Sequence, residues 1–126
     1  MNDEAPRVSW RQLREFAGVD LGRSFVLAWD VAGDRLTIDV DLCLEPDHPF
    51  YEAPRPAEEV CIRPACIEFP ACDDVALAGS EQGKLTDNIK NIGIGAIADL
   101  SVVADGRYEI RGEFGTVLIT AERPLL

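Results

Sequence analysis

Several ingredients of common functional sites are missing from this sequence of 126 residues. Histidine occurs once, at His48, so no histidine pair can bind a metal. There is no nucleophile elbow and no phosphate-binding glycine loop, and Gly93-Ile94-Gly95 lacks the third glycine of a dinucleotide fingerprint. We therefore expect no catalytic residue, no cofactor and no metal, which favours a protein that is not an enzyme.

Basic residues are scarce as well: 12 Lys and Arg stand against 23 Asp and Glu, a formal net charge of −11. This charge repels phosphate and anionic lipid headgroups, so nucleic acid and membranes are not expected partners. No apolar run approaches the ~20 residues of a membrane helix, and the acidic N-terminus lacks the apolar core of a secretory signal. These absences predict a cytoplasmic protein and leave its oligomeric state open.

The four cysteines are expected to be reduced thiols that pack as small hydrophobic residues. Zinc ligation is the alternative, but the spacing Cys61-x4-Cys66-x5-Cys72, with Cys43 upstream, lacks the close pairs typical of zinc sites. On an unbroken strand Cys61 and Cys66 would point to opposite faces, and only a bulge at Pro64 could align them. Because the spacing lacks paired ligands and the core does not need a metal, we expect no stoichiometric zinc.

The chain is long enough for a single domain. With 47% hydrophobic residues, a chain of this mass can bury about two thirds of its unfolded surface. We expect a flexible N-terminus over residues 1–8, a short helix over 9–17 and a β core over 24–121. The helix is predicted from Ser9 as N-cap, Gly18 as terminator and one apolar face made by Trp10, Leu13 and Phe16.

Alternating apolar residues on both sides of Gly33-Asp34 predict a β-hairpin with a two-residue turn. The turn sets a register in which one buried face contains four pairs: Val31 with Leu36, Trp29 with Ile38, Leu27 with Val40 and Phe25 with Leu42. On the opposite face, Asp39 lies opposite Ala28 and Asp41 opposite Val26.

Further strands are expected over residues 59–69, 74–78, 96–104, 108–111 and 116–121. Residues 45–58 contain four prolines and read as a connection. Residues 59–69 change apolar parity near Pro64, which predicts a bulge at Pro64-Ala65. The fold class is therefore mainly β: an antiparallel β-sandwich or partly closed barrel of about seven strands, with one short N-terminal helix.

Two surfaces are candidate sites. The acidic residues Asp30, Asp39 and Asp41 form either a solvated sheet face or a docking face for a basic protein. Phe50 and Tyr51 fold back as a lid over one end of the core or stand out as interface anchors. The first hypothesis is thus a non-enzymatic protein-binding domain. The alternative is a small-ligand binder or enzyme with its site at a barrel mouth near His48 and Tyr51.

Three motifs carry a resemblance: Phe25-Val26-Leu27-Ala28-Trp29, His48-Pro49-Phe50-Tyr51-Glu52 and Gly112-Glu113-Phe114-Gly115. In this order they resemble a group of small acidic bacterial proteins to which no activity is attached, over roughly residues 24–121. The compact, acidic, β-rich character also looks like that of bacterial immunity proteins that neutralise toxins. This likeness implies a basic protein partner and transfers no functional residue.

Overall fold

The computed structural model describes residues 8–54, 56, 59–78 and 89–126, and this part of the chain is mainly β. Every strand pair is antiparallel, as predicted. The strands are β1 (Val8–Ser9), β2 (Val19–Ala32), β3 (Arg35–Leu44), β4 (Cys61–Phe69), β5 (Asp74–Leu77), β6 (Gly95–Ala104), β7 (Arg107–Gly112) and β8 (Gly115–Thr120).

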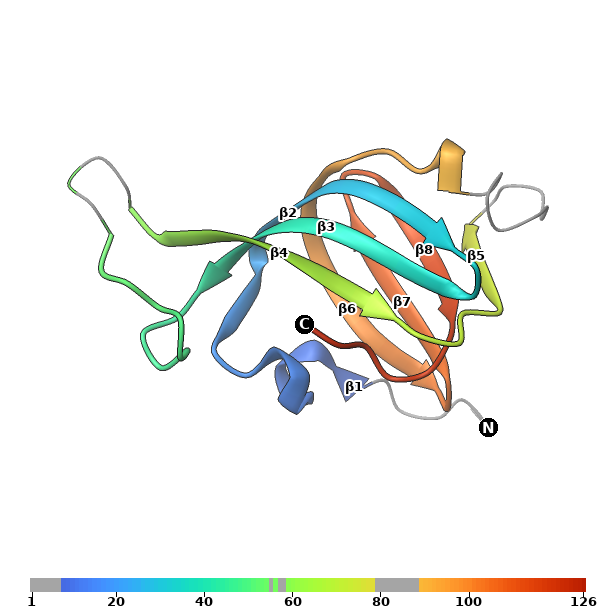
Figure 1. Ribbon diagram of the computed structural model, residues 1–126, viewed down its shortest axis with the longest axis horizontal. Coiled ribbons are helices and arrows are strands. Elements are labelled where there is room, and N and C mark those ends of the chain that lie inside the picture. The colour runs from blue at the N-terminus through green and yellow to red at the C-terminus, as the bar shows by residue number, and fades with distance from the viewer. Residues whose placement is uncertain (1–7, 55, 57–58, 79–88) are drawn as a thin grey trace, which may run out of the picture.

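The eight strands form one sheet in the order β4-β3-β2-β6-β7-β8-β5, with β1 paired to β6. The outermost strands, β4 and β5, do not pair with each other, so the sheet is open within the described residues. A two-sheet sandwich or partly closed barrel is therefore not supported. Instead the sheet bends over on itself, so that β2, β3 and β4 lie across β6, β7 and β8 (Figure 1).

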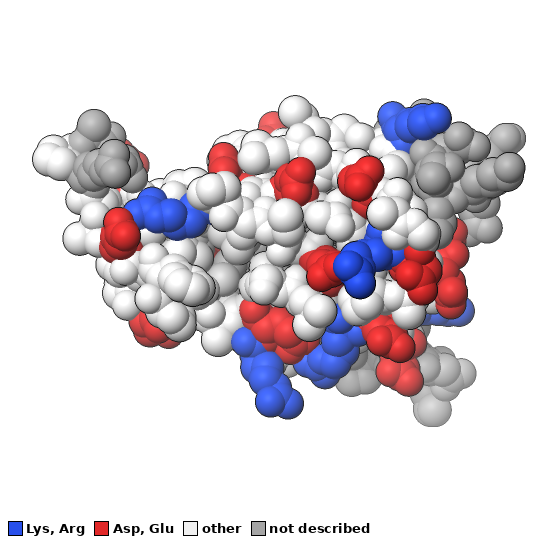
Figure 2. Space-filling view, in the orientation of Figure 1, with Lys and Arg blue, Asp and Glu red and all other residues white. Residues whose placement is uncertain are grey.

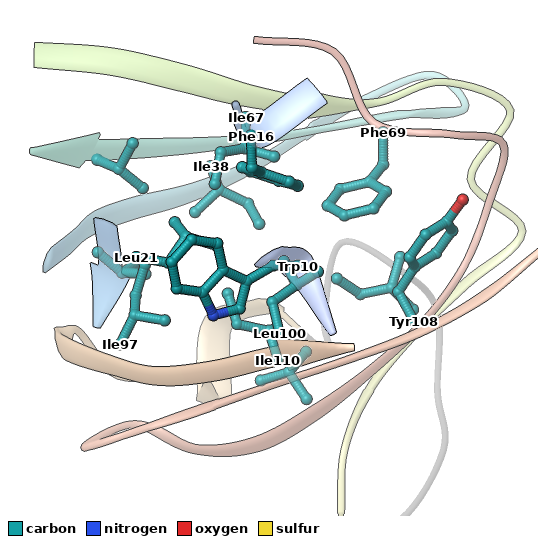
Figure 3. Close-up of a cluster of buried hydrophobic side chains, with 14 of the residues drawn as sticks. Trp10, Phe16, Leu21, Ile38, Ile67, Phe69, Ile97, Leu100, Tyr108 and Ile110 are labelled. Atoms are coloured by element: carbon teal, nitrogen blue, oxygen red, sulfur yellow. The ribbon is translucent and has the colours of Figure 1, made fainter. Parts of the chain in front are cut away.

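The core lies between the two halves of this bent sheet. Phe69 of β4 and Tyr108 of β7 contact each other across it, with ring centroids 5.1 Å apart. Trp10 is 4% exposed and lies between Ile67, on the β4 side, and Ile110, on the β7 side (Figure 3). One apolar cluster thus joins both halves and the N-terminal segment.

In place of the helix predicted over residues 9–17, the structure has two 3-10 turns, η1 (Trp10–Gln12) and η2 (Arg14–Phe16). The predicted N-cap is present, since the Ser9 side chain accepts the Arg11 N–H. Trp10, Leu13 and Phe16 are all buried, as expected. Their spacing of three residues matches the three residues per turn of a 3-10 helix better than the 3.6 of an α-helix.

The N-terminus expected to be flexible over residues 1–8 ends in a strand, because Val8 pairs with Val102 in β6; residues 1–7 lie outside the described residues. A third 3-10 turn, η3 (Ile89–Asn91), precedes β6. None of the helical segments in the described ranges has the length and hydrophobicity to cross a bilayer.

The predicted β2–β3 hairpin is correct near its turn and wrong beyond it. Gly33 has φ +63° in the turn, and the pairs of Trp29 with Ile38 and Ala28 with Asp39 are as expected. Leu27 is then an extra residue, because Val26 pairs with Val40 and Phe25 with Asp41. Because of this β-bulge, the side chains of Phe25 and Val26 point to the opposite sides of the sheet from those expected.

A second irregularity brings β2 back into pairing with the end of β3. Four residues, 21–24, separate Asp20 and Phe25, whose partners Cys43 and Asp41 have one residue between them. The buried Ser24 hydroxyl donates to the Asp20 carbonyl oxygen at 2.8 Å and accepts the Cys43 N–H at 3.0 Å. The side-chain hydroxyl thus replaces a missing backbone partner within the irregular stretch.

The bulge predicted at Pro64-Ala65 is absent, because β4 pairs with β3 without a shift from Cys61 to Phe69. The backbone N–H and C=O of Glu68 both bond to Leu125, so they point away from β3. Pro64 has the same parity, so its missing N–H also faces the outer edge and removes no ladder bond to β3. The buried face of β4 begins at Cys61, rather than at Val60 and Ile62.

The two halves of the sheet meet where Phe25 and Val26 of β2 pair with Ala96 and Gly95 of β6; we call this junction the seam. The Trp29 indole N–H donates to the Gly93 carbonyl oxygen at 2.7 Å. Its ring packs edge-on against Phe114, with centroids 5.3 Å apart. The Glu113 carboxylate accepts the Ala96 N–H at 2.7 Å. Two of the three resemblance motifs therefore meet in holding the seam.

Candidate functional site

The outer sides of β2, β3 and β4 form the first candidate site, which we call the acidic face. Asp39 lies between Ala28 of β2 and Cys66 of β4, and Asp41 lies between Phe25 and Pro64. Asp30 is exposed two pairs closer to the hairpin turn than Asp39. Figure 2 views this face and shows acidic side chains set among uncharged ones. The structure thus brings together the three acids singled out from the sequence.

These three carboxylates have no basic partner among the residues that the structure describes. Arg35, the cation nearest in sequence, pairs with Glu68 at 2.7 Å. Asp39 accepts only the Cys66 thiol, at 3.1 Å between Sγ and Oδ1. Within the described part of the chain, the negative charge of this face is therefore not neutralised by an ion pair.

Large apolar side chains accompany this charge. The sequence placed Phe25 and Leu27 in the core, but each is 47% exposed. Phe25 faces Asp41 across the pair, so the two share one side of the sheet. Exposed aromatic and aliphatic groups beside charges are typical of interfaces. No local signal reveals this arrangement, because the apolar alternation continues through the bulge without a break.

The cysteines show no nucleophile. Cys43, Cys61 and Cys72 are buried, as expected, whereas Cys66 is exposed on the acidic face. Burial raises the pKa of Cys43, and it raises that of Cys72 to about 11. The hydrogen bond to Asp39 raises the pKa of Cys66. These three side chains are therefore neutral thiols at pH 7, the less reactive form.

No three His, Cys, Asp or Glu side chains in the described ranges lie close enough together to hold a metal ion. Cys61 and Cys66 point to opposite faces, because the strand between them is unbroken. The geometry therefore offers no zinc centre in this part of the chain.

A groove of about 520 Å³ is the second candidate site. Its apolar surface comes from neighbouring strands and from the end of the chain: Leu42 and Leu44 of β3, Pro64 and Ala65 of β4, and Leu126. Its polar or aromatic groups are His48, Phe50, Glu52 and Arg63. This volume is within the range of small-molecule sites.

The groove contains only part of the site predicted near His48 and Tyr51. His48 lies in it, and its Nδ1 accepts the Phe50 N–H at 3.1 Å. Phe50 is 77% exposed, so it does not form the expected lid. Tyr51 is half-buried against the core and lines a separate hollow with Cys43 and Cys61. Neither aromatic residue belongs to the acidic face.

Arg63 is the groove residue that the sequence analysis missed. It pairs with Leu42, on the inner face of β4, between the buried positions Cys61 and Ile67. Its guanidinium donates to the Ile62 carbonyl oxygen at 2.7 Å and to the Glu52 carboxylate at 3.0 Å. A charged residue inside an otherwise apolar series of alternate residues was the available signal.

The fold and the two surfaces define a small antiparallel β protein with an uncompensated acidic face and a separate apolar groove. No protein-family model, curated protein or solved structure matches the chain.

Proposed function

We propose that the chain is a non-enzymatic binding protein that docks a basic protein through the acidic face, in the manner of a toxin-immunity protein. The observation that carries the proposal is the bulge at Leu27, since it turns Phe25 outward opposite Asp41 and leaves Leu27 itself 47% exposed. A face kept only for solvation would need the carboxylates but not the exposed phenyl ring and leucine.

The two kinds of side chain have different roles in this proposal. Asp30, Asp39 and Asp41 attract the partner over a distance and orient its Lys or Arg side chains. Phe25 and Leu27 then lose their contact with water, which slows dissociation. A partner of this kind carries an apolar patch bordered by basic residues.

Affinity capture from the native cells, followed by kinetics with the purified partner, tests the proposal. The double variant Asp39→Asn/Asp41→Asn should lower the association rate roughly tenfold at low salt, and the loss should shrink at high salt. The double variant Phe25→Ser/Leu27→Ser should raise the dissociation rate instead. Both should fold, because none of the four changed side chains is buried in the core.

The matched control is Asp105→Asn/Glu122→Gln, which changes the net charge equally on the β6–β7 turn and after β8. It should capture the same basic protein as the original sequence. Equal recovery by all variants, or recovery of no basic protein by any of them, would show that the acidic face is only a solvated sheet surface.

A further inference from the structure

The groove is independent of the acidic face and carries its own inference. Its base consists of alternate residues on the inner sides of β3 and β4, where Leu42 and Leu44 are 3% and 5% exposed. The loop after β3 supplies His48 and Phe50. Leu126 is held nearby, because Leu125 forms two backbone hydrogen bonds with Glu68. The site thus has fixed apolar surfaces on two strands and at the C-terminal residues.

The groove's polar groups are mainly hydrogen-bond donors. The His48 Nδ1 accepts a backbone N–H, so the neutral ring carries its proton on Nε2 and can only donate there. The Arg63 guanidinium has five N–H groups, and its contacts with Ile62 and Glu52 leave further donors. Such a set favours an acceptor, above all an anion.

Glu52 occupies Arg63 without being fixed there. The Glu52 side chain is 73% exposed, whereas that of Arg63 is 35% exposed. An ion pair open to water on one side contributes little to stability, so another carboxylate can replace Glu52 at small cost. Among the side chains that the structure describes in this groove, that of Glu52 is the acidic one.

We propose that the groove binds a small amphipathic carboxylate, whose head group replaces Glu52 on Arg63 and whose hydrocarbon body packs against Phe50, Ala65 and Leu126, above the base formed by Leu42 and Leu44. His48 donates a second hydrogen bond to the head group from Nε2. The net charge of −11 repels anions at long range. Screening at physiological ionic strength limits this repulsion to about 8 Å, so the short-range contacts decide binding.

Octanoate is the probe, and calorimetry on the full chain measures its affinity. Octanol and octyltrimethylammonium keep the tail and remove or reverse the head-group charge, so both should bind at least about tenfold more weakly. Amide NMR shifts should concentrate around His48, Ala65 and the Arg63 side chain. Acetate, which lacks the tail, should not bind measurably.

Two variants with opposite effects make the test specific. Arg63→Gln should weaken octanoate binding about tenfold. Glu52→Gln should strengthen it several-fold, because it removes the competing carboxylate. Arg35→Gln is the matched control, since Arg35 also pairs with a glutamate but lies outside the groove. It should leave octanoate affinity unchanged.

The proposal is overturned if octanoate does not bind, if octanol binds equally well, or if NMR shifts map outside the groove. It is also overturned if Arg63→Gln binds octanoate like the original sequence. Circular dichroism confirms that each variant is folded before its affinity is compared. Because Phe25, Leu27, Asp30, Asp39 and Asp41 are unchanged throughout, failure here leaves the protein-docking proposal standing.

Discussion

Glu15 and Arg123 lie 108 positions apart in the sequence and form a two-point ion pair. The Arg123 Nε lies 3.0 Å from one Glu15 carboxylate oxygen, and its Nη2 lies 2.8 Å from the other. Only 14% of the Glu15 side chain is exposed. The contact attaches turn η2 to the segment after β8, so it joins the two ends of the chain.

At the residue scale, we expect Arg123→Gln to lower the Tm at pH 7 by a few degrees. The hydrogen bond from Arg123 holds the pKa of Glu15 below its ordinary value of 4.5. A lowered carboxyl pKa stabilises the fold above the unfolded-state value, and this stability is lost as the pH falls through the folded-state value. The Tm difference between the two proteins should therefore shrink below about pH 4.

Thermal unfolding followed by circular dichroism across this pH range measures the effect. Arg23→Gln is the control, because the Arg23 contact with Asp20 is longer, at 3.7 Å, and its side chain is 66% exposed. A Tm difference for Arg123→Gln that stays constant through the acid range would show that the ion pair is not its cause.

At the scale of single elements, the bulge at Leu27 determines how β2 is used. On the hairpin-turn side of the bulge, the Trp29 indole donates to Gly93 beside the seam. On the other side, Phe25 and Val26 pair with both β3 and β6. A bulge bends a strand and increases its twist. The bend therefore allows one strand to belong to both halves of the sheet.

Deleting Leu27 tests this role. The deletion leaves Val26 opposite Val40 and Ala28 opposite Asp39 with no extra residue, so the β2–β3 ladder becomes regular. We expect it nevertheless to destabilise the protein by about 1–3 kcal/mol in urea unfolding, because the straightened strand meets β6 poorly. Leu27→Ala keeps the bulge and should change stability by about 0.5 kcal/mol or less. Equal stabilities for the two variants would contradict the role of the bend.

The same elements show what the sequence could predict. Local patterns identified the strands and the Gly33 turn, because alternation and turn residues act between neighbours. The bulge lies next to Phe25 and Val26, which pair with β6, a strand distant in sequence, so it was not predictable from local alternation, which Phe25 and Leu27 both fit. On β4, Cys61 has the same parity as the buried residues Ile67 and Phe69. Counting Cys61 as a buried hydrophobic residue would therefore have predicted an unbroken strand without the change of parity at Pro64.

The two candidate sites also differ in how far local sequence could predict them. The acidic face was predictable, because Asp39 and Asp41 alternate along one strand and share a side. The groove was not, because it depends on where the long connection after β3 places His48 and Glu52 relative to Arg63. Sequence proximity associated Tyr51 with His48, but the chain turns Tyr51 toward the core instead.

At the scale of the whole molecule, repulsion between the excess negative charges lowers the stability of the folded state. The formal charge of −11 is spread over a small surface, and the acidic face alone holds three carboxylates without basic partners in the described part of the chain. Raising the ionic strength from about 0.01 M to 0.15 M shortens the Debye length from about 30 Å to 8 Å.

We therefore expect the Tm to rise by several degrees when sodium chloride is added over this range at constant pH. Attractive surface ion pairs such as Arg35–Glu68 are screened as well and would lower the Tm. Scanning calorimetry decides between the two effects. A Tm that falls with salt would mean that attraction between charges outweighs repulsion, and that the acidic face costs no stability. Asp39→Asn/Asp41→Asn should reduce the salt dependence if repulsion dominates.

Pro64 has a consequence for the molecule in a crowded solution. An open sheet ends in a strand whose free backbone groups can template the addition of a further strand, and such growth leads to aggregation. On β4 the outward-facing positions are those of Ile62, Pro64, Cys66 and Glu68. Leu125 already covers Glu68, and Pro64 offers an incoming strand no hydrogen to bond. Pro64 thus removes one backbone donor from the middle of this edge and weakens it as a template for a further strand.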